Sequence, residues 1–346
     1  MAAKNCWQNL MKIKDTVIYI PYYVKGDKNN AYTFNMIKLL KEKFIVAGSL
    51  AEPADVLRLL RTKAVFLNWI EADLDYKMKM QLLFHKLTGA KIVWVFHNKY
   101  PHDAALSRRI VQNMKWLARY SSIIMLHSKS SRKYIPNAAR NKKKSVYIPH
   151  VLYEQQIRKN DIATIKAEYG ICNADFVFTI FGMVRPYKNI EGAIEAFKKL
   201  NLNNARLLIA GNPVNKKYAE KITRLCKEEN IILDLKYLSN YKLDCVLEIS
   251  DVIVIPYKDR SSMNSGVMIH AFSKGKTVIA PDICMARDMA ANNFFYMHHG
   301  FLKKTMAKAY ENGKDMNRKM GEKAQDYILK YNNHKIVREA LDNILC

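Results

Sequence analysis

Short apolar runs of strand length alternate with amphipathic stretches of helical period along this chain, and this alternation limits its possible folds more than any other feature. In the first half, the runs lie at residues 16–23, 44–48, 64–70, 91–97, 122–128 and 145–151. Strands that alternate with helices form parallel sheets, because each helix returns the chain to the edge where the next strand begins. The first half is therefore expected to be an α/β domain.

The alternation begins again in the second half. Its apolar runs lie at residues 175–184, 205–211, 231–237, 251–257 and 276–282. Two successive units of similar size, in a chain of 346 residues, predict two Rossmann-like domains with a ligand cleft between them. We place the domains at residues 1–151 and 152–330, and we expect an amphipathic helix within residues 331–346.

Composition restricts location and metal chemistry. No run approaches the roughly 20 apolar residues of a membrane-spanning helix, and the start of the chain lacks the apolar core of a signal peptide. We therefore expect a cytoplasmic protein. The six cysteines show no CxxC spacing, which argues against a zinc site or a disulfide framework.

Positive charge is concentrated in the first half. The chain carries a net charge of +26, and residues 1–150 hold 27 Lys and Arg against 9 Asp and Glu. A surface this basic attracts nucleic acid, an anionic membrane or phosphorylated ligands. Solvated surface lysines without a partner are the alternative reading.

Familiar cofactor motifs are missing. The segment after the first strand, PYYVKGDKNN, contains no GxGxxG, and the chain has no GxxxxGK[ST], no HExxH and no Asp-x-Asp at a strand end. These absences argue against a nicotinamide enzyme, an ATPase of the phosphate-loop type and a metalloprotease.

Two loops of the second half suit an anion instead. FGMVRPYKNIEGAIEAF places Arg185 and Lys188 between a strand and a helix, and YKDRSSMNSGVMIHAF places Asn264, Ser265 and Gly266 where another helix begins. Free amides at a helix start and flanking cations bind phosphate. An Arg or Lys in a solvated surface loop is the plainer interpretation.

A polar cluster follows the strand run at 91–97. VWVFHNKYPHD brings His97, Asn98, His102 and Asp103 to its end. Ligands of open α/β sheets bind outside the carboxyl ends of the strands. The cluster is therefore expected to line a site, although a polar loop with two histidines would have the same sequence.

Five segments together resemble the GT-B fold glycosyltransferases, in the group around family 4 and the bacterial β-mannosyltransferase-like polysaccharide enzymes. FGMVRPYKNIEGAIEAF is similar to FGxxRPYKGxxxxxxAF, and DVIVIPYKDRSSMNSGVMIHAFSKGKTVIAPD resembles DxxxxPYxxxxxSGxxxxAxxxGxPVIAPD. NAYTFNMIKLL, FLNWIEADL and VFHNKYPHD resemble three motifs of the first domain of that group. The resemblance covers nearly the whole chain.

Some positions depart from the family pattern. Ser262 and His270 stand where retaining family 4 enzymes carry a glutamate pair, which leaves room for an inverting mechanism. Met183 replaces an arginine often found in the phosphate loop, so Arg185 and Lys188 must supply the charge.

The resemblance implies a role for each half. The first domain would bind the acceptor and the second a nucleotide sugar, without a metal ion or other cofactor, and the last helix would pack back toward the first domain. Glu71, His97 and Asp103 are the candidate catalytic residues. The expected donor-binding residues are Arg185, Lys188, Asn264, Ser265, Gly266 and His270, although His270 is equally well a buried structural histidine. The expected acceptor-side residues are Tyr22, Asn30, Tyr32, Trp69, Asn98 and His102.

The implied function is sugar transfer from GDP-mannose or a UDP-sugar to a saccharide or a polyprenyl-diphosphate-linked saccharide in surface polysaccharide synthesis. The basic first domain would hold the enzyme on the anionic inner face of the plasma membrane. The alternative is a non-catalytic protein that binds nucleic acid or an anionic membrane through the same basic half. No recognition helix or exposed aromatic sheet supports nucleic-acid binding.

Overall fold

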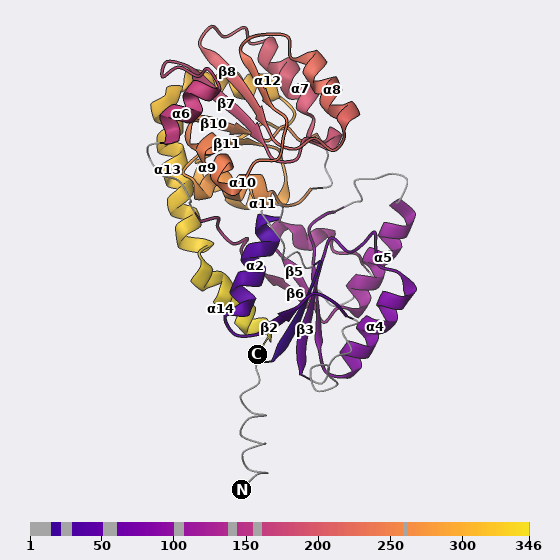
Figure 1. The fold of residues 1–346 in the computed structure, drawn as a ribbon. Coiled ribbons are helices and arrows are strands. Elements are labelled where there is room, and N and C mark those ends of the chain that lie inside the picture. Colours follow the sequence, from indigo (N-terminus) through magenta and orange to yellow (C-terminus); the bar gives the residue numbers. More distant parts are fainter. Residues whose placement is uncertain are drawn as a thin grey trace. The chain divides into compact units, whose positions relative to one another are not determined.

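The computed structural model describes residues 15–21, 30–50, 61–99, 107–137, 144–154, 161–258 and 262–345. The chain forms two compact α/β units (Figure 1). The first comprises the chain up to His127, Arg132–Ile148 and the segment from His334 onward, and the second comprises Ser128–Ser131 and Pro149–Asn333. The predicted α/β class with two Rossmann-like domains is confirmed.

In the described residues, the first unit has a six-stranded parallel sheet in the order β2-β1-β3-β4-β5-β6. Its strands are β1 (Thr16–Ile20), β2 (Ile45–Ala47), β3 (Thr62–Asn68), β4 (Lys91–Val95), β5 (Ile123–Leu126) and β6 (Ser145–Tyr147). The run predicted at 64–70 was too long at its end, because Trp69 has a φ of 49°, outside the β region. The strand predicted at 122–128 likewise ends at Leu126.

Helices cover both faces of this sheet. They are α2 (Ala31–Lys41), α4 (Tyr76–Leu87), α5 (Ser107–Tyr120) and α14 (His334–Leu345). A 3₁₀ turn, η1 (Lys129–Tyr134), follows β5 and is divided between the two units at Ser131. Asn30 caps α2 by accepting a hydrogen bond from Tyr32 N at 3.0 Å. Asp75 caps α4 in the same way, with Met78 N at 2.7 Å.

The terminal helix α14 belongs to the first unit. It buries Val337, Leu341 and Ile344. Its ion pairs join it to the two residues that follow α2, Arg338 to Glu42 and Asp342 to Lys43. The predicted amphipathic helix is present, and its apolar face completes the core of that unit.

The second unit has a six-stranded sheet in its described residues, in the order β12-β11-β10-β7-β8-β9. Its strands are β7 (Phe176–Phe181), β8 (Ala205–Ala210), β9 (Ile231–Asp234), β10 (Val252–Val254), β11 (Thr277–Ala280) and β12 (Tyr296–Met297). All pairs are parallel. The run predicted at 175–184 ends at Phe181 because Gly182 takes a φ of 88°, and those at 231–237 and 251–257 are also shorter than predicted.

The helices of this unit lie on both faces of its sheet (Figure 1). They are α6 (Asp161–Glu168), α7 (Ile190–Lys198), α8 (Lys216–Leu225), α9 (Asn240–Glu248), α10 (Gly266–Ser273), α11 (Cys284–Met289), α12 (Leu302–Glu311) and α13 (Gly313–Tyr331), with 3₁₀ turns η3 (Pro186–Lys188) and η4 (Ala290–Asn292). The central strands β7 and β8 are almost entirely buried, which explains their continuous apolar runs. Among the described helices, none has the length and apolar character to cross a bilayer.

Candidate functional site

The loop after β7 is shaped by two glycines. Gly182 and Gly211 have φ values of 88° and 150°, a region that favours glycine. A Cβ on Gly211 would lie 2.0 Å from the Gly182 carbonyl oxygen, and a Cβ on Gly182 would lie 3.3 Å from Lys188 Nζ. The bare backbone at both positions therefore lets the loop close and the lysine amine fold back over it.

The same loop is fastened to the segment that follows β10. Asn189, also at positive φ, donates from Nδ2 to the Pro256 carbonyl at 3.0 Å. The rings of Tyr187 and Tyr257 lie 5.7 Å apart, and Lys188 Nζ lies 5.9 Å from the centre of the Tyr257 ring. These contacts bring the two predicted anion-binding loops together at the carboxyl edge of adjacent strands β7 and β10.

Lys188 is a buried cation that lies near a second cation, Arg185. The Lys188 side chain is 6% exposed, and burial together with the nearby charge of Arg185 lowers the pKa of Lys188 to about 8. Arg185 Nε is also buried without a hydrogen-bond partner. No carboxylate in the described part of the chain pairs with either side chain. A buried ammonium with a second cation beside it stabilises a bound anion strongly.

The second loop ends in the start of α10. Ser265 caps this helix by accepting a hydrogen bond from Met268 N at 3.2 Å, and the helix begins at Gly266. Both polar atoms of the Asn264 carboxamide are buried without a protein partner. Burial raises the pKa of Tyr257, which also hydrogen-bonds with the Ser265 side chain. Free first-turn amides and an unpartnered carboxamide are donors suited to phosphate oxygens.

His270 lies in a different environment. Its Nε2 is 3.5 Å from Asp244 Oδ1, its ring stacks on Tyr153 at 4.4 Å, and Lys274 pairs with the same aspartate at 2.9 Å. Burial lowers the pKa of His270, which favours the neutral ring. This network is typical of a buried structural histidine. Contact of His270 with a donor stays a prediction.

At the carboxyl edge of the first unit, aromatic side chains form a compact cluster. The Trp69 and His97 rings stack with centres 4.3 Å apart, and Tyr32 meets both rings edge-on. His97 Nε2 is 3.2 Å from Asn68 Oδ1. Trp69 has a positive φ of 49° at this position. The structure thus gathers three of the predicted residues, Tyr32, Trp69 and His97, at one edge.

Sequence reasoning did not assign His127, which holds Tyr32 in place. His127 Nδ1 faces the Ile148 carbonyl at 2.8 Å and must therefore carry the proton. Its Nε2 then accepts the hydrogen bond from the Tyr32 hydroxyl at 2.7 Å. Burial lowers the pKa of His127 to about 4, so the ring is neutral. His127 directly follows β5, and this position at a strand end is the sequence signal that could have identified it.

Glu71 is half-buried, and one of its carboxylate oxygens is held by a core side chain. Its Oε1 accepts a hydrogen bond from Trp94 Nε1 at 2.9 Å, and burial raises the pKa of Glu71. Asn30 is exposed and acts as a helix cap, and Asn98 is half-buried after β4. Tyr22, His102 and Asp103 lie outside the described residues, so their predicted roles have no structural counterpart.

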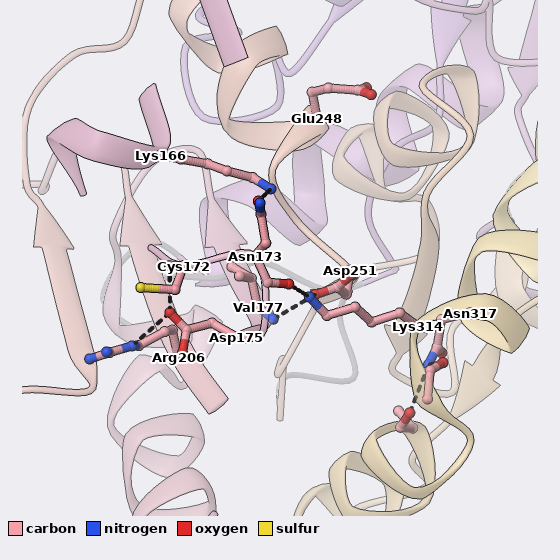
Figure 2. Close-up of polar contacts among 12 residues, drawn as sticks. Lys166, Cys172, Asn173, Asp175, Val177, Arg206, Glu248, Asp251, Lys314 and Asn317 are labelled. Atoms are coloured by element: carbon pink, nitrogen blue, oxygen red, sulfur yellow. Dashed lines mark hydrogen bonds and ion pairs between the residues drawn. The ribbon is translucent and has the colours of Figure 1, made fainter. Parts of the chain in front are cut away.

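A cavity of about 350 Å³ lies at the amino edge of the second sheet, and Figure 2 shows its polar contacts. Lys314 donates to the Asn173 carbonyl at 2.6 Å, and Asp251 accepts from Val177 N at 2.8 Å. Four cations line the cavity with four acids: Lys166, Lys276, Lys314, Arg318, Asp175, Glu248, Asp251 and Asp315. This balanced lining does not favour an anion, unlike the loop that contains Lys188.

Known proteins share sequence with part of this chain. Residues 161–327 match the model of the family "Glycosyl transferases group 1". A GDP-mannose:glycolipid 4-beta-D-mannosyltransferase of Xanthomonas campestris pv. campestris is 24% identical over 235 residues, which are 64% of this chain and 62% of that protein. This chain thus spans less than two thirds of the length of that relative.

Solved structures share the fold at low sequence identity. Anabaena Alr3699/HepE, solved with UDP and glucose, has a TM-score of 0.74 and 12% identity, covering 96% of this chain and 99% of that one. A glycosyltransferase from Rickettsia africae has a TM-score of 0.70 and 14% identity, with 96% and 98% covered. The predicted GT-B fold is confirmed.

Proposed function

Because residues 161–327 form a group 1 glycosyltransferase domain within a chain of the GT-B glycosyltransferase fold, we propose that this protein transfers a sugar from a nucleotide-sugar donor to a saccharide acceptor. The observation that carries the proposal is Lys188, a buried cation beside Arg185 with no carboxylate partner among the described residues. The second unit would hold the donor and the first unit the acceptor.

The diphosphate of the donor would lie against the loop that contains Lys188 and the start of α10. Negative charge grows on the leaving diphosphate as the glycosidic bond breaks, and fixed cations and helix amides stabilise that charge. Lys188, Arg185 and the amides that follow Ser265 are such groups. The proposed mechanism therefore needs no metal ion or other cofactor.

The acceptor hydroxyl needs a group that takes its proton. We propose His97 and Glu71 of the first unit as the candidates, with Asp103 as a third. The stacked ring of Trp69 fixes the plane of His97, and the raised pKa of Glu71 makes its carboxylate a stronger base. The serine and histidine at the family's glutamate positions, Ser262 and His270, are consistent with an inverting reaction.

Donor and acceptor are proposed from the relatives' names. The Xanthomonas protein is named for GDP-mannose and a glycolipid, and the Anabaena structure contains UDP. We therefore propose GDP-mannose or a UDP-sugar as donor. The proposed acceptor is a saccharide, free or linked to polyprenyl diphosphate at the cytoplasmic face of the plasma membrane, in surface polysaccharide synthesis.

The proposal is tested by a thermal-shift screen of UDP, GDP and their sugars, followed by a transfer assay with the sugar that stabilises most. Stabilisation by one nucleoside diphosphate and by its sugar is expected, since bound ligand shifts the unfolding equilibrium. A protein that no nucleotide sugar stabilises, but that shifts generic RNA or DNA in a salt-dependent manner, would establish the nucleic-acid alternative.

Donor affinity should depend on pH through Lys188. The free protein loses the charge of this lysine as pH rises through about 8, and a bound diphosphate favours the charged form. The affinity for UDP or GDP should therefore fall about tenfold between pH 7 and pH 9, as measured by titration calorimetry. The variant Lys188→Arg should not lose affinity in this way, because its guanidinium stays charged. Ionisation of the nucleotide affects both proteins equally, so the affinity of the wild type divided by that of the variant isolates the effect of Lys188.

Replacing His97 with alanine should separate chemistry from donor binding. Turnover should fall at least about a hundredfold, since a proton acceptor or orienting group is lost. The dissociation constant for the nucleoside diphosphate should stay unchanged, because the proposed donor site lies wholly in the second unit. Normal turnover would remove His97 from the mechanism, and a parallel loss of nucleotide binding would contradict its assignment to the acceptor.

A further inference from the structure

The cavity at the amino edge of the second sheet lies at the opposite end of β7 from the loop that contains Lys188. Asp175, Asp251 and Lys276 each directly precede one of the strands β7, β10 and β11. Because β7 has six residues and a strand rises about 3.3 Å per residue, about 20 Å separates its two ends. The cavity volume of about 350 Å³ is within the range of small-molecule sites. The cavity is therefore large enough for a ligand and separate from the proposed donor site.

Some of the charged side chains that line this cavity already have close partners. Asp175 pairs with Arg206 at 3.3 Å. Arg318 pairs with Glu322 at 2.7 Å and with Asp315 at 3.6 Å. The charged lining residues outside these pairs are Lys166, Lys276, Lys314, Glu248 and Asp251.

Two of these lysines have donor hydrogens left for a ligand. Lys276 Nζ donates to the Glu248 carbonyl at 2.9 Å and lies 3.9 Å from the carboxylate of that residue. Lys314 Nζ donates to the Asn173 carbonyl at 2.6 Å and lies 4.0 Å from Asp251 Oδ2 (Figure 2). An ammonium carries three donor hydrogens, and within the described ranges each lysine uses one. The charges of both lysines act on Asp251, so a ligand carboxylate beside that residue would meet both.

Asp251 offers the opposite charge to the same space. Its Oδ2 accepts from Val177 N at 2.8 Å, whereas its Oδ1 accepts no hydrogen bond from the part of the chain that the structure describes. Burial raises the pKa of Asp251 and lowers the pKa of Lys276. A close ion pair shifts both pKa values in the opposite directions. The two groups therefore compensate each other poorly, and each would be stabilised by a ligand group of opposite charge.

Apolar side chains form another part of the wall. They are Ile162, Ile171, Val177 and Ile249. Ile171, Val177 and Ile249 belong to a buried apolar cluster of the second unit, and Ile162 packs against it. Contact with such a wall removes ligand hydrocarbon from water. The lining as a whole thus suits a ligand that carries a carboxylate, an ammonium and an aliphatic group.

We propose that this cavity binds a small zwitterion with an aliphatic side chain, which is the chemistry of a free apolar amino acid. The ligand carboxylate would accept hydrogen bonds from Lys276 and Lys314, and the ligand ammonium would donate to Asp251 Oδ1. The aliphatic group would pack on Ile171 and Ile249. The inference goes beyond the proposed function, because this site contacts neither the donor nor the acceptor.

Titration calorimetry of the full chain with leucine tests the ligand class. Leucine should bind, and two analogues of leucine that each lack one charge should bind at least about tenfold more weakly. Isocaproate lacks the ammonium, and isoamylamine lacks the carboxylate. The absence of leucine binding would overturn the proposal, as would an equal affinity of either analogue. This comparison uses the wild type, so it does not depend on how well any variant folds.

Two variants test the location of the ligand. Lys276→Met removes a proposed partner of the carboxylate. Asp251→Asn removes the proposed partner of the ammonium, while its amide oxygen can still accept from Val177 N. Each should weaken leucine binding at least about tenfold. Lys323→Met and Asp326→Asn, both exposed on α13, are the matched controls and should stay within about twofold of the wild type. Equal losses in test and control variants, or none in the test variants, would contradict this location.

The donor site provides a further distinction. Lys188→Met should bind leucine as the wild type does, since Lys188 lies at the other end of β7. Loss of leucine binding in that variant would place leucine at the donor loops and overturn the proposal. Asp251→Asn should keep the wild-type affinity for UDP and GDP. A wild-type protein that binds leucine but no nucleotide would refute the proposed function alone, and one that binds nucleotide but not leucine would refute this inference alone.

Discussion

Replacing Lys188 with methionine should abolish measurable binding of nucleoside diphosphate and lower sugar transfer at least about a hundredfold. Methionine keeps much of the length of the side chain and removes its charge. Because burial lowers the pKa of Lys188 below its ordinary value, the charged amine destabilises the folded protein at pH 7. The melting temperature of the free variant should therefore be equal to or above that of the wild type.

Two further variants make this result specific. Lys217→Met removes an exposed lysine of α8 and should leave both binding and transfer unchanged. Lys188→Arg restores a cation and should recover part of the binding. Calorimetric titration with UDP and GDP gives the affinities. Undiminished affinity of the methionine variant would end the assignment of this loop to the donor.

Replacing Gly211 with alanine should destabilise the second unit by about 4 kcal/mol and lower its melting temperature by roughly 10 °C. The new Cβ would lie 2.0 Å from the Gly182 carbonyl oxygen, and the φ of 150° disfavours any side chain. The turn that carries Lys188 would have to shift, so nucleoside diphosphate affinity should also fall.

Gly170→Ala is the matched control for this effect. Gly170 belongs to the same unit and also has positive φ, but a Cβ there meets no atom within 4 Å. It should cost only about 1 kcal/mol, from backbone strain alone. Denaturant unfolding of the wild type and the two variants measures both losses of stability. Equal destabilisation by the two variants would show that the contact with Gly182 does not constrain the turn.

The sequence predicted the layers of the fold well, because a parallel strand buried on both faces must be apolar throughout. It placed strand ends less well. Trp69 and Gly182 are apolar or small, and nothing in the apolar pattern shows that their backbones leave the β region. The two-residue strand β12 is too short to give any pattern.

The positions of several candidate site residues were predictable from the sequence, whereas their contacts were not. Lys188 and Ser265 were found because loops after parallel strands lie at one edge of a sheet. The pairing of Tyr32 with His127 joins residues 95 positions apart in the chain, and the hydrogen bond from Trp94 to Glu71 spans 23. Such contacts depend on tertiary packing, which local spacing does not encode. Ser265 was expected as an anion contact, and its hydroxyl also caps α10.

The membership of α14 in the first unit has a practical outcome for dissecting the molecule. A fragment ending near residue 150 would leave bare the surface that Val337, Leu341 and Ile344 cover, and Lys91 would lose the Ile344 carbonyl that it contacts at 3.0 Å. One cut cannot release an intact amino-terminal half. Grafting the last helix onto such a fragment through a short linker would restore its missing wall.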